Sequence, residues 1–190
     1  VERIAALHQG ADRGYHGWSH PQALLELHAG VAGSLNDPLA VYGAILMHDA
    51  IYEPRATDNE KRSAVLATSM LAGHLPPETL ARTVRLIEAT ARHAVPEGLS
   101  AEEAADMAMF LDMDLSILGA DEAAFDTYEA GVRHEYREIP DDQFRAGRAH
   151  ILEGFLARDR LFLSDWGHGR FEQAARANLR RSIDQLRRGG

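Results

Sequence analysis

Residues 37–49 read DPLAVYGAILMHD. Asp37 followed by Pro38 is typical of a helix start, because Asp caps the first turn and Pro fits the first helical position. The residues that follow are apolar on nearly every side, so we expect this helix to run through the middle of a helical core. It ends in His48-Asp49, and an ionised Asp there needs a cation or hydrogen bonds to offset its desolvation. A buried His–Asp hydrogen bond or a C-terminal cap is the simpler alternative.

The rest of the chain carries Ala, Leu, Arg and Glu at helical spacing, and no apolar/polar alternation runs long enough to indicate a strand. Ser19, Thr57 and Ser100 each have Gln or Glu three residues later, as in a capping box. The sequence therefore predicts an all-α fold. We expect helices near residues 20–33, 38–50, 58–73, 77–94, 101–118, 122–138, 141–157 and 169–188. Because no repeat or linker divides the chain, residues 1–190 are expected to form one compact domain, with the 169–188 helix packed on it or flanking it.

Composition and charge narrow the classes of function. The 190 residues carry 20 Lys+Arg against 29 Asp+Glu, a net charge of −9, which would repel a nucleic-acid backbone. The arginine-rich residues 170–188 are interpreted as a solvated helix face, so nucleic acid is not an expected partner. Residues 40–47 form the longest apolar stretch, far short of the ~20 residues of a membrane span, and the first residues lack signal-peptide features. We expect a soluble, cytoplasmic protein with no membrane partner.

A second unusual stretch is MAMFLDMDLSIL, residues 107–118. It places Asp112 and Asp114 in a helix that is otherwise apolar, pointing about 200° apart, so one solvated face cannot hold both. Asp112 shares its face with small residues, which would let another helix or an ion approach closely. An ion pair with Arg133 or Arg137 is the structural alternative, and for Asp114 it is as good an explanation as a metal.

The segment YHGWSH, residues 15–20, adds two histidines. His20 is expected in the first turn of a helix and His16 in the loop before it. A His-x3-His pair alone often binds no metal. Together, however, His20, His48-Asp49 and Asp112 offer two imidazoles and two carboxylates from three helices, and helix-bundle cores commonly hold such metal sites. Because the sequence has no Cys, a metal would depend on these residue types.

The order His, His-Asp, Asp resembles the HD-domain superfamily of metal-dependent phosphohydrolases, which are all-α. The similarity extends over nearly the whole chain and is closest to a bacterial branch of that superfamily. The motifs that carry it are Tyr15-His16-x3-His20, His48-Asp49-Ala-Ile-Tyr52, Asp58-Asn59-Glu60-x2-Ser63-Ala64, Leu86-Ile87-x2-Thr90-x2-His93, Leu111-Asp112-Met-Asp114-Leu115, Arg133-x-Glu135-Tyr136 and Asn178-Leu179.

The resemblance implies a ligand set of His20, His48, Asp49 and one late aspartate. The apolar neighbours favour Asp112 for this last position, with Asp114 and His93 as the alternative ligand or as groups behind the ligands. The first motif is also similar to that of cyclic-nucleotide phosphodiesterases, which implies that His16 is the general acid. Arg62, Arg92, Arg133, Asn59 and Glu60 are candidate phosphate or substrate contacts. Surface or interhelix ion pairs are the alternative for the three arginines.

These expectations define a function. Mixed N/O ligands suit one octahedral divalent ion, either Mn, Fe, Co, Ni, Zn or Mg, which would lower the pKa of its water toward roughly 7–9. Asp49 would accept the proton and His16 would return one to the leaving group. The sequence thus predicts a phosphomonoesterase or phosphodiesterase that hydrolyses a small phosphoester, with a nucleotide as the expected substrate and a homodimer as a candidate assembly. The alternative is a non-catalytic helical module of the same fold that retains the metal and serves in binding or signalling.

Overall fold

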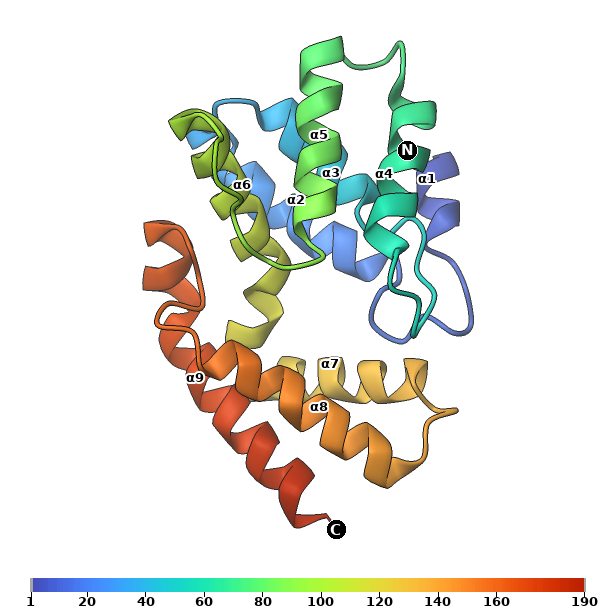
Figure 1. Ribbon diagram of the computed structural model, residues 1–190, viewed down its shortest axis with the longest axis vertical. Coiled ribbons are helices and arrows are strands. Elements are labelled where there is room, and N and C mark those ends of the chain that lie inside the picture. The colour runs from blue at the N-terminus through green and yellow to red at the C-terminus, as the bar shows by residue number, and fades with distance from the viewer. Residues whose placement is uncertain (1, 190) are drawn as a thin grey trace.

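The computed structural model describes residues 2–189 and confirms the all-α fold, with no strand in that range (Figure 1). Its elements are α1 (Glu2–Leu7), α2 (Ser19–Val31), η1 (Ala32–Ser34), α3 (Pro38–Met47), α4 (Asn59–Leu71), α5 (Pro77–Ala89), α6 (Ala101–Asp114), η2 (Leu115–Gly119), α7 (Glu122–Glu135), α8 (Asp141–Leu156) and α9 (Asp165–Arg188), where η denotes a 3₁₀-helix. Every predicted helix is present, and α1 is an addition.

The helix ends show which start signals were interpreted correctly. Asp37 accepts a hydrogen bond from the Ala40 N–H, and Ser100 accepts one from the Glu103 N–H, as the cap patterns predict. The other two capping boxes are wrong. Ser19 lies inside α2, after an N-cap that makes no side-chain bond, and Asp58 rather than Thr57 precedes α4.

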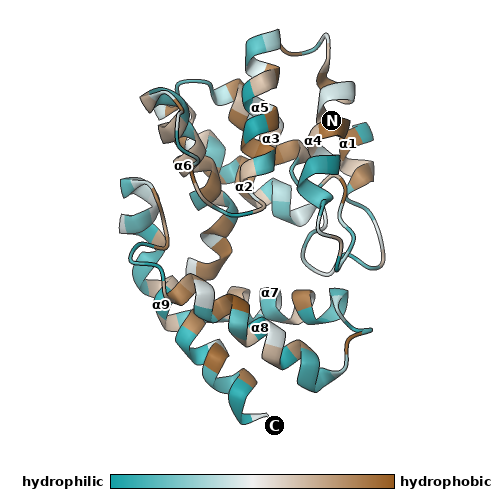
Figure 2. Ribbon diagram, in the orientation of Figure 1, coloured by the Kyte–Doolittle hydropathy of each residue, from teal (hydrophilic) through white to brown (hydrophobic). Residues whose placement is uncertain are grey.

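Two apolar clusters form the core, one on each side of the α6–η2 junction. The first surrounds α3, whose Val41, Ala44 and Ile45 are fully buried, and it draws on α1 to α6. The second is formed by η2 and α7 to α9 and includes Phe125, Leu152 and Phe162 (Figure 1). Apolar residues are concentrated in α3 and along the lower part of α6 in Figure 2. The predicted central position of the 38–50 helix is therefore confirmed.

The two clusters are joined by contacts that need special residues. In α9, a Cβ at Gly167 would lie 2.3 Å from Asp112 Oδ2, so only glycine lets α9 approach α6 this closely. In the loop before α2, a Cβ at Gly14 would lie 2.4 Å from the Gly131 carbonyl oxygen, so this loop packs backbone to backbone on α7. These approaches fix α7 and α9 against the elements that carry the candidate site.

Within residues 2–189, none of the helices combines the length and the apolar character needed to cross a bilayer.

Candidate metal centre

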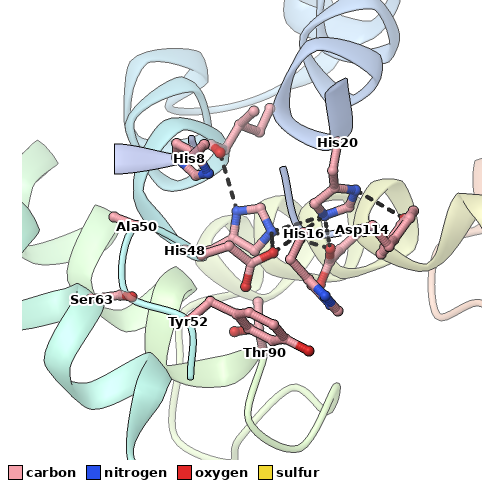
Figure 3. Close-up of polar contacts among 12 residues, drawn as sticks. His8, His16, His20, His48, Ala50, Tyr52, Ser63, Thr90 and Asp114 are labelled. Atoms are coloured by element: carbon pink, nitrogen blue, oxygen red, sulfur yellow. Dashed lines mark hydrogen bonds and ion pairs between the residues drawn. The ribbon is translucent and has the colours of Figure 1, made fainter. Parts of the chain in front are cut away.

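Four side chains converge where the two apolar clusters meet. His20 comes from the first turn of α2, His48 and Asp49 directly follow α3, and Asp114 is the last residue of α6. The Nε2 atoms of His20 and His48 lie 3.0 Å apart, and Asp114 Oδ1 lies 3.0 Å from the first and 3.4 Å from the second. Figure 3 shows both imidazoles directed at the Asp114 carboxylate. His20, His48 and Asp114 therefore form a buried group that could hold a metal ion.

Asp49 faces the same point. Its Oδ2 lies 3.1 Å from His48 Nε2 and 3.7 Å from His20 Nε2. For metal–ligand bonds of about 2.1 Å, neighbouring ligand atoms lie about 3.0 Å apart in an octahedron and about 3.4 Å apart in a tetrahedron. The measured separations fall at or near these values, so the spacing of the four groups fits a small divalent cation.

The hydrogen bonds behind the imidazoles favour the same interpretation. His48 Nδ1 lies 3.1 Å from the carbonyl oxygen of Ile45, and a carbonyl only accepts, so this nitrogen carries a proton. In the neutral ring, Nε2 then presents its lone pair to the cluster. His20 Nδ1 is bonded to the Tyr15 hydroxyl, which orients that ring. Such partners on the far nitrogen commonly orient metal-binding histidines.

The electrostatics of the cluster call for positive charge. Burial alone would lower the pKa of His48, but the carboxylates of Asp49 and Asp114 outweigh it and raise that pKa well above its usual value. Burial likewise acts to raise the pKa of each aspartate, yet the histidines lower both below the usual range. The site thus holds two ionised carboxylates in a largely buried position, where positive charge from the histidines or from a bound cation would balance them.

The structure corrects the expectation that Asp112 is the late ligand. Its carboxylate accepts hydrogen bonds from the N–H groups of Leu163 and Ser164, at 2.6 and 2.7 Å, and from the Ser164 hydroxyl at 2.5 Å. The small-residue face of α6 does admit a close neighbour, but that neighbour is the start of α9 rather than an ion. Asp112 anchors the second half of the chain, and Asp114 occupies the position that the sequence assigned to Asp112.

His93 lies behind Asp114, in one of the two positions that the sequence left open for it. Its Nε2 is 3.0 Å from Asp114 Oδ2, the oxygen that does not face the cluster histidines. The backbone of His93 has a φ of 45°, and its carbonyl accepts a hydrogen bond from Arg158. A non-glycine residue in this conformation is uncommon and costs about 1–3 kcal/mol, so the surrounding contacts hold His93 against strain.

His16 is paired with a carboxylate that the sequence interpretation missed. Its Nδ1 lies 2.7 Å from Glu135 Oε2, and its own N–H donates to Glu135 Oε1. Glu135 also accepts from the Tyr52 hydroxyl, and the Tyr52 ring stacks on His16 with centroids 4.0 Å apart. Burial opposes ionisation of Glu135, but the hydrogen bonds from His16 lower its pKa overall. The signal was present in the motif Arg133-x-Glu135-Tyr136, whose glutamate was not considered as a partner.

This pairing leaves the other ring nitrogen of His16 free to act. The centroids of the His16 and His20 rings are 6.3 Å apart, so His16 lies beside the cluster without joining it. A carboxylate that fixes one imidazole nitrogen and leaves the other directed at a substrate is the arrangement used for proton transfer in hydrolases.

Two further residues hold the segments that carry the site. The Arg13 guanidinium donates to the carbonyl oxygens of His16 and Asp49, at 2.7 and 2.8 Å, and so ties the two segments together. Ser63 bonds both the N–H and the carbonyl of Ile51, which fixes the loop after Asp49 on α4. The role of Ser63 in the 58–64 motif is thus to hold the backbone of this loop. Arg13 carried no sequence signal, because it bonds backbone carbonyls, and one of them, that of Asp49, lies 36 residues away in the chain.

Three of the five candidate phosphate contacts, Arg62, Asn59 and Arg133, are bonded to groups outside the cluster. Arg62 pairs with Glu53 at the surface, and Asn59 bonds the backbone of Glu53 through both its amide atoms. Arg133 bonds Asp141 and the carbonyls of Tyr136 and Ile139, so it secures the connection from α7 to α8. Arg92 is exposed, and Glu60 is half-buried in the first turn of α4. For Arg62 and Arg133 the structure thus matches the ion-pair alternative.

A cavity of about 380 Å³ opens beside His16. Tyr52 and Arg55 also line it, and α7, α8 and the connection between them supply the rest of its wall. Comparisons of the chain with protein-family models, with curated proteins and with solved structures found no match.

Proposed function

We propose that this protein is a metal-dependent phosphohydrolase of the HD-domain type, acting on a phosphoester of a small molecule such as a nucleotide. One observation carries the proposal: a buried cluster that could hold a cation lies next to a histidine whose Nδ1 is bonded to a carboxylate, and that histidine lines a cavity of ligand size. A non-catalytic module would need the cluster but not the His16–Glu135 pair.

His20, His48, Asp49 and Asp114 are the residues that would hold the cation. A divalent ion bound there would supply a water ligand of lowered pKa and a Lewis acid for a phosphoryl oxygen. Asp49 is the most exposed of the four side chains, at 19%, against 2–10% for the others. It is therefore the group best placed to meet solvent or substrate and to accept a proton.

His16 would donate a proton from Nε2 to the oxygen of the leaving group. Glu135 is bonded to Nδ1, which orients the ring and leaves Nε2 for the leaving group, as in other histidine–carboxylate pairs. General-acid catalysis of this kind contributes about 10²–10⁴ in rate. The contribution is largest when the leaving group is a poor one, since an alkoxide needs the proton more than an activated phenolate does.

The test compares His16→Ala with wild type and with the control His150→Ala, a change at an exposed histidine of α8. Each protein is loaded with Mn²⁺, Co²⁺, Ni²⁺ or Mg²⁺ and assayed on alkyl phosphates, an activated aryl phosphate and a panel of nucleotides. We expect His16→Ala to retain the cation by elemental analysis and to lose about 10²-fold or more in kcat on alkyl esters, with a smaller loss on the aryl ester.

The outcome separates the two functional classes. If wild type binds the cation but hydrolyses none of these compounds, the protein is a binding module and the hydrolase proposal fails. If His16→Ala hydrolyses alkyl and aryl esters as well as wild type, His16 is not the acid.

A further inference from the structure

The cavity beside His16 has a wall that is mainly apolar and aromatic. Its lining residues beyond His16 are Tyr52, Arg55, Tyr128, Val132, Tyr136, Ile139, Gln143, Phe144, Gly147, Arg148 and Ile151. Its volume, about 380 Å³, lies within the usual range for small-molecule sites. Ile151, which lines it, is 51% exposed and adds apolar surface to the wall.

The charged groups of the wall are few. Arg148 is 8% exposed, and its charge is offset by Glu129, 2.5 Å from its Nη2, and by the Tyr128 hydroxyl. Its guanidinium also lies over the Tyr128 ring, 5.1 Å from the centroid. Among the described lining residues, Arg55 is thus the single arginine without an ion pair. A chain of several phosphates would find too little positive charge here, whereas an apolar ring would find matching surface.

The position of His16 decides which part of a substrate enters the cavity. In the proposed function, on which this inference rests, His16 protonates the leaving oxygen, and the organic group is attached to that oxygen. Because His16 forms part of the cavity wall, the organic group extends into the cavity while the phosphoryl group stays at the cation cluster.

We propose that the α7–α8 cavity is the subsite for the organic group of the substrate, and that it selects phosphomonoesters whose organic group carries a flat aromatic ring. Tyr136 and Phe144 lie with ring centroids 6.3 Å apart in this wall, and Tyr52 is held by its stack on His16. These rings are largely fixed before any ligand binds, so little freedom is lost on binding.

Gly147 allows a direct test. It lies in α8 and lines the cavity, and a Cβ added there would meet no atom within 4 Å. Gly147→Leu therefore adds a side chain at the cavity wall with no clash at its Cβ. Gly154 lies in the same helix, is equally open around its Cβ, and belongs to none of the cavity walls described for this chain. Gly154→Leu is thus the matched control, because both changes raise helix propensity by a similar amount.

The experiment measures binding, so it does not depend on turnover. Phenylphosphonate and methylphosphonate, which are not hydrolysed, are titrated by calorimetry into the cation-loaded protein. We expect wild type and Gly154→Leu to bind phenylphosphonate roughly tenfold to fiftyfold more tightly than methylphosphonate, because the phenyl ring buries additional apolar area. Gly147→Leu should bring this ratio close to one while keeping its cation-dependent thermal shift, which shows that the variant is folded.

Two results would overturn the subsite. Either wild type binds the two phosphonates equally, or Gly147→Leu keeps the preference of wild type for the aromatic compound. Failure of the proposed function is distinguishable from both, since a protein that prefers phenylphosphonate but hydrolyses no phosphoester has the subsite without the activity.

Discussion

Asp112 and Asp114 lie two residues apart on α6 but have different roles in the structure. A pair of single variants can distinguish these two roles. Asp112 accepts three hydrogen bonds from Leu163 and Ser164, whereas Asp114 faces His20 and His48. We predict that Asp112→Asn lowers stability and keeps cation binding, and that Asp114→Asn removes cation binding.

The magnitudes follow from these contacts. An amide at position 112 turns one acceptor into a donor and leaves at least one buried N–H unpaired, which costs about 3 kcal/mol. In a chain of this length, that lowers Tm by about 6–12 °C. A cation at a hundred times its Kd stabilises the folded state by about 2.7 kcal/mol, or about 5–11 °C. For Asp114→Asn we expect a hundredfold weaker site. The same cation concentration then stabilises the folded state by only about 0.4 kcal/mol, which raises Tm by about 1 °C.

The assay is thermal unfolding of both variants and wild type, with a chelator and with a saturating divalent cation. Asp112→Asn should melt lower in both conditions and keep the full cation-dependent rise. Asp114→Asn should lose that rise. The reverse pattern, with the rise lost at position 112 and kept at 114, would refute the ligand assignment and restore the expectation from sequence.

Two further predictions concern the fold. Gly131→Ala should lower the free energy of unfolding by about 1–3 kcal/mol, because a Cβ there would lie 2.8 Å from the Gly14 carbonyl oxygen. Urea denaturation measures this change, and an unchanged midpoint would mean that the loop with Gly14 shifts without cost. Burial opposes ionisation of Glu172, but hydrogen bonds from backbone N–H groups, Leu161 among them, and from Arg176 lower its pKa overall. Its contribution to stability is therefore present above the unfolded pKa, about 4.3, and is lost as the pH falls through the lower folded value. Glu172→Gln should be less stable than wild type at pH 7 by about 2 kcal/mol, and the difference in free energy of unfolding should be smaller at pH 3. An equal difference at both pH values would contradict a role for the ionised carboxylate.

Local patterns predicted much of this molecule, because the patterns and their causes lie close together in the chain. Helical spacing and two of the caps located the helices, and the apolar 38–47 stretch correctly predicted the central helix. The start of α9 was missed because Gly167 and Gly169 look like a loop. Gly167 is instead helical, and its missing side chain admits the Asp112 carboxylate.

The site shows where such patterns stop. His20, His48 and Asp49 were expected to meet, and the structure brings them together. They could be found from the sequence because polar residues are unusual in such apolar surroundings. The apolar neighbours favoured Asp112 over Asp114, and the structure reverses this choice, because both aspartates lie on one helix and only tertiary packing distinguishes their partners. Glu135 meets His16 across a separation of 119 residues, which no local pattern reports.

The four groups of the cation cluster all come from residues 20–114, whereas Glu135 and most of the cavity wall come from α7 and α8. In the proposed enzyme, binding the ion and choosing the substrate are therefore properties of different parts of the chain. Substitutions along α7 and α8 can redirect the protein to another organic group while the ion keeps every one of its ligands. A scaffold arranged in this way is open to change of specificity, by selection or by design, without the chemistry having to be rebuilt.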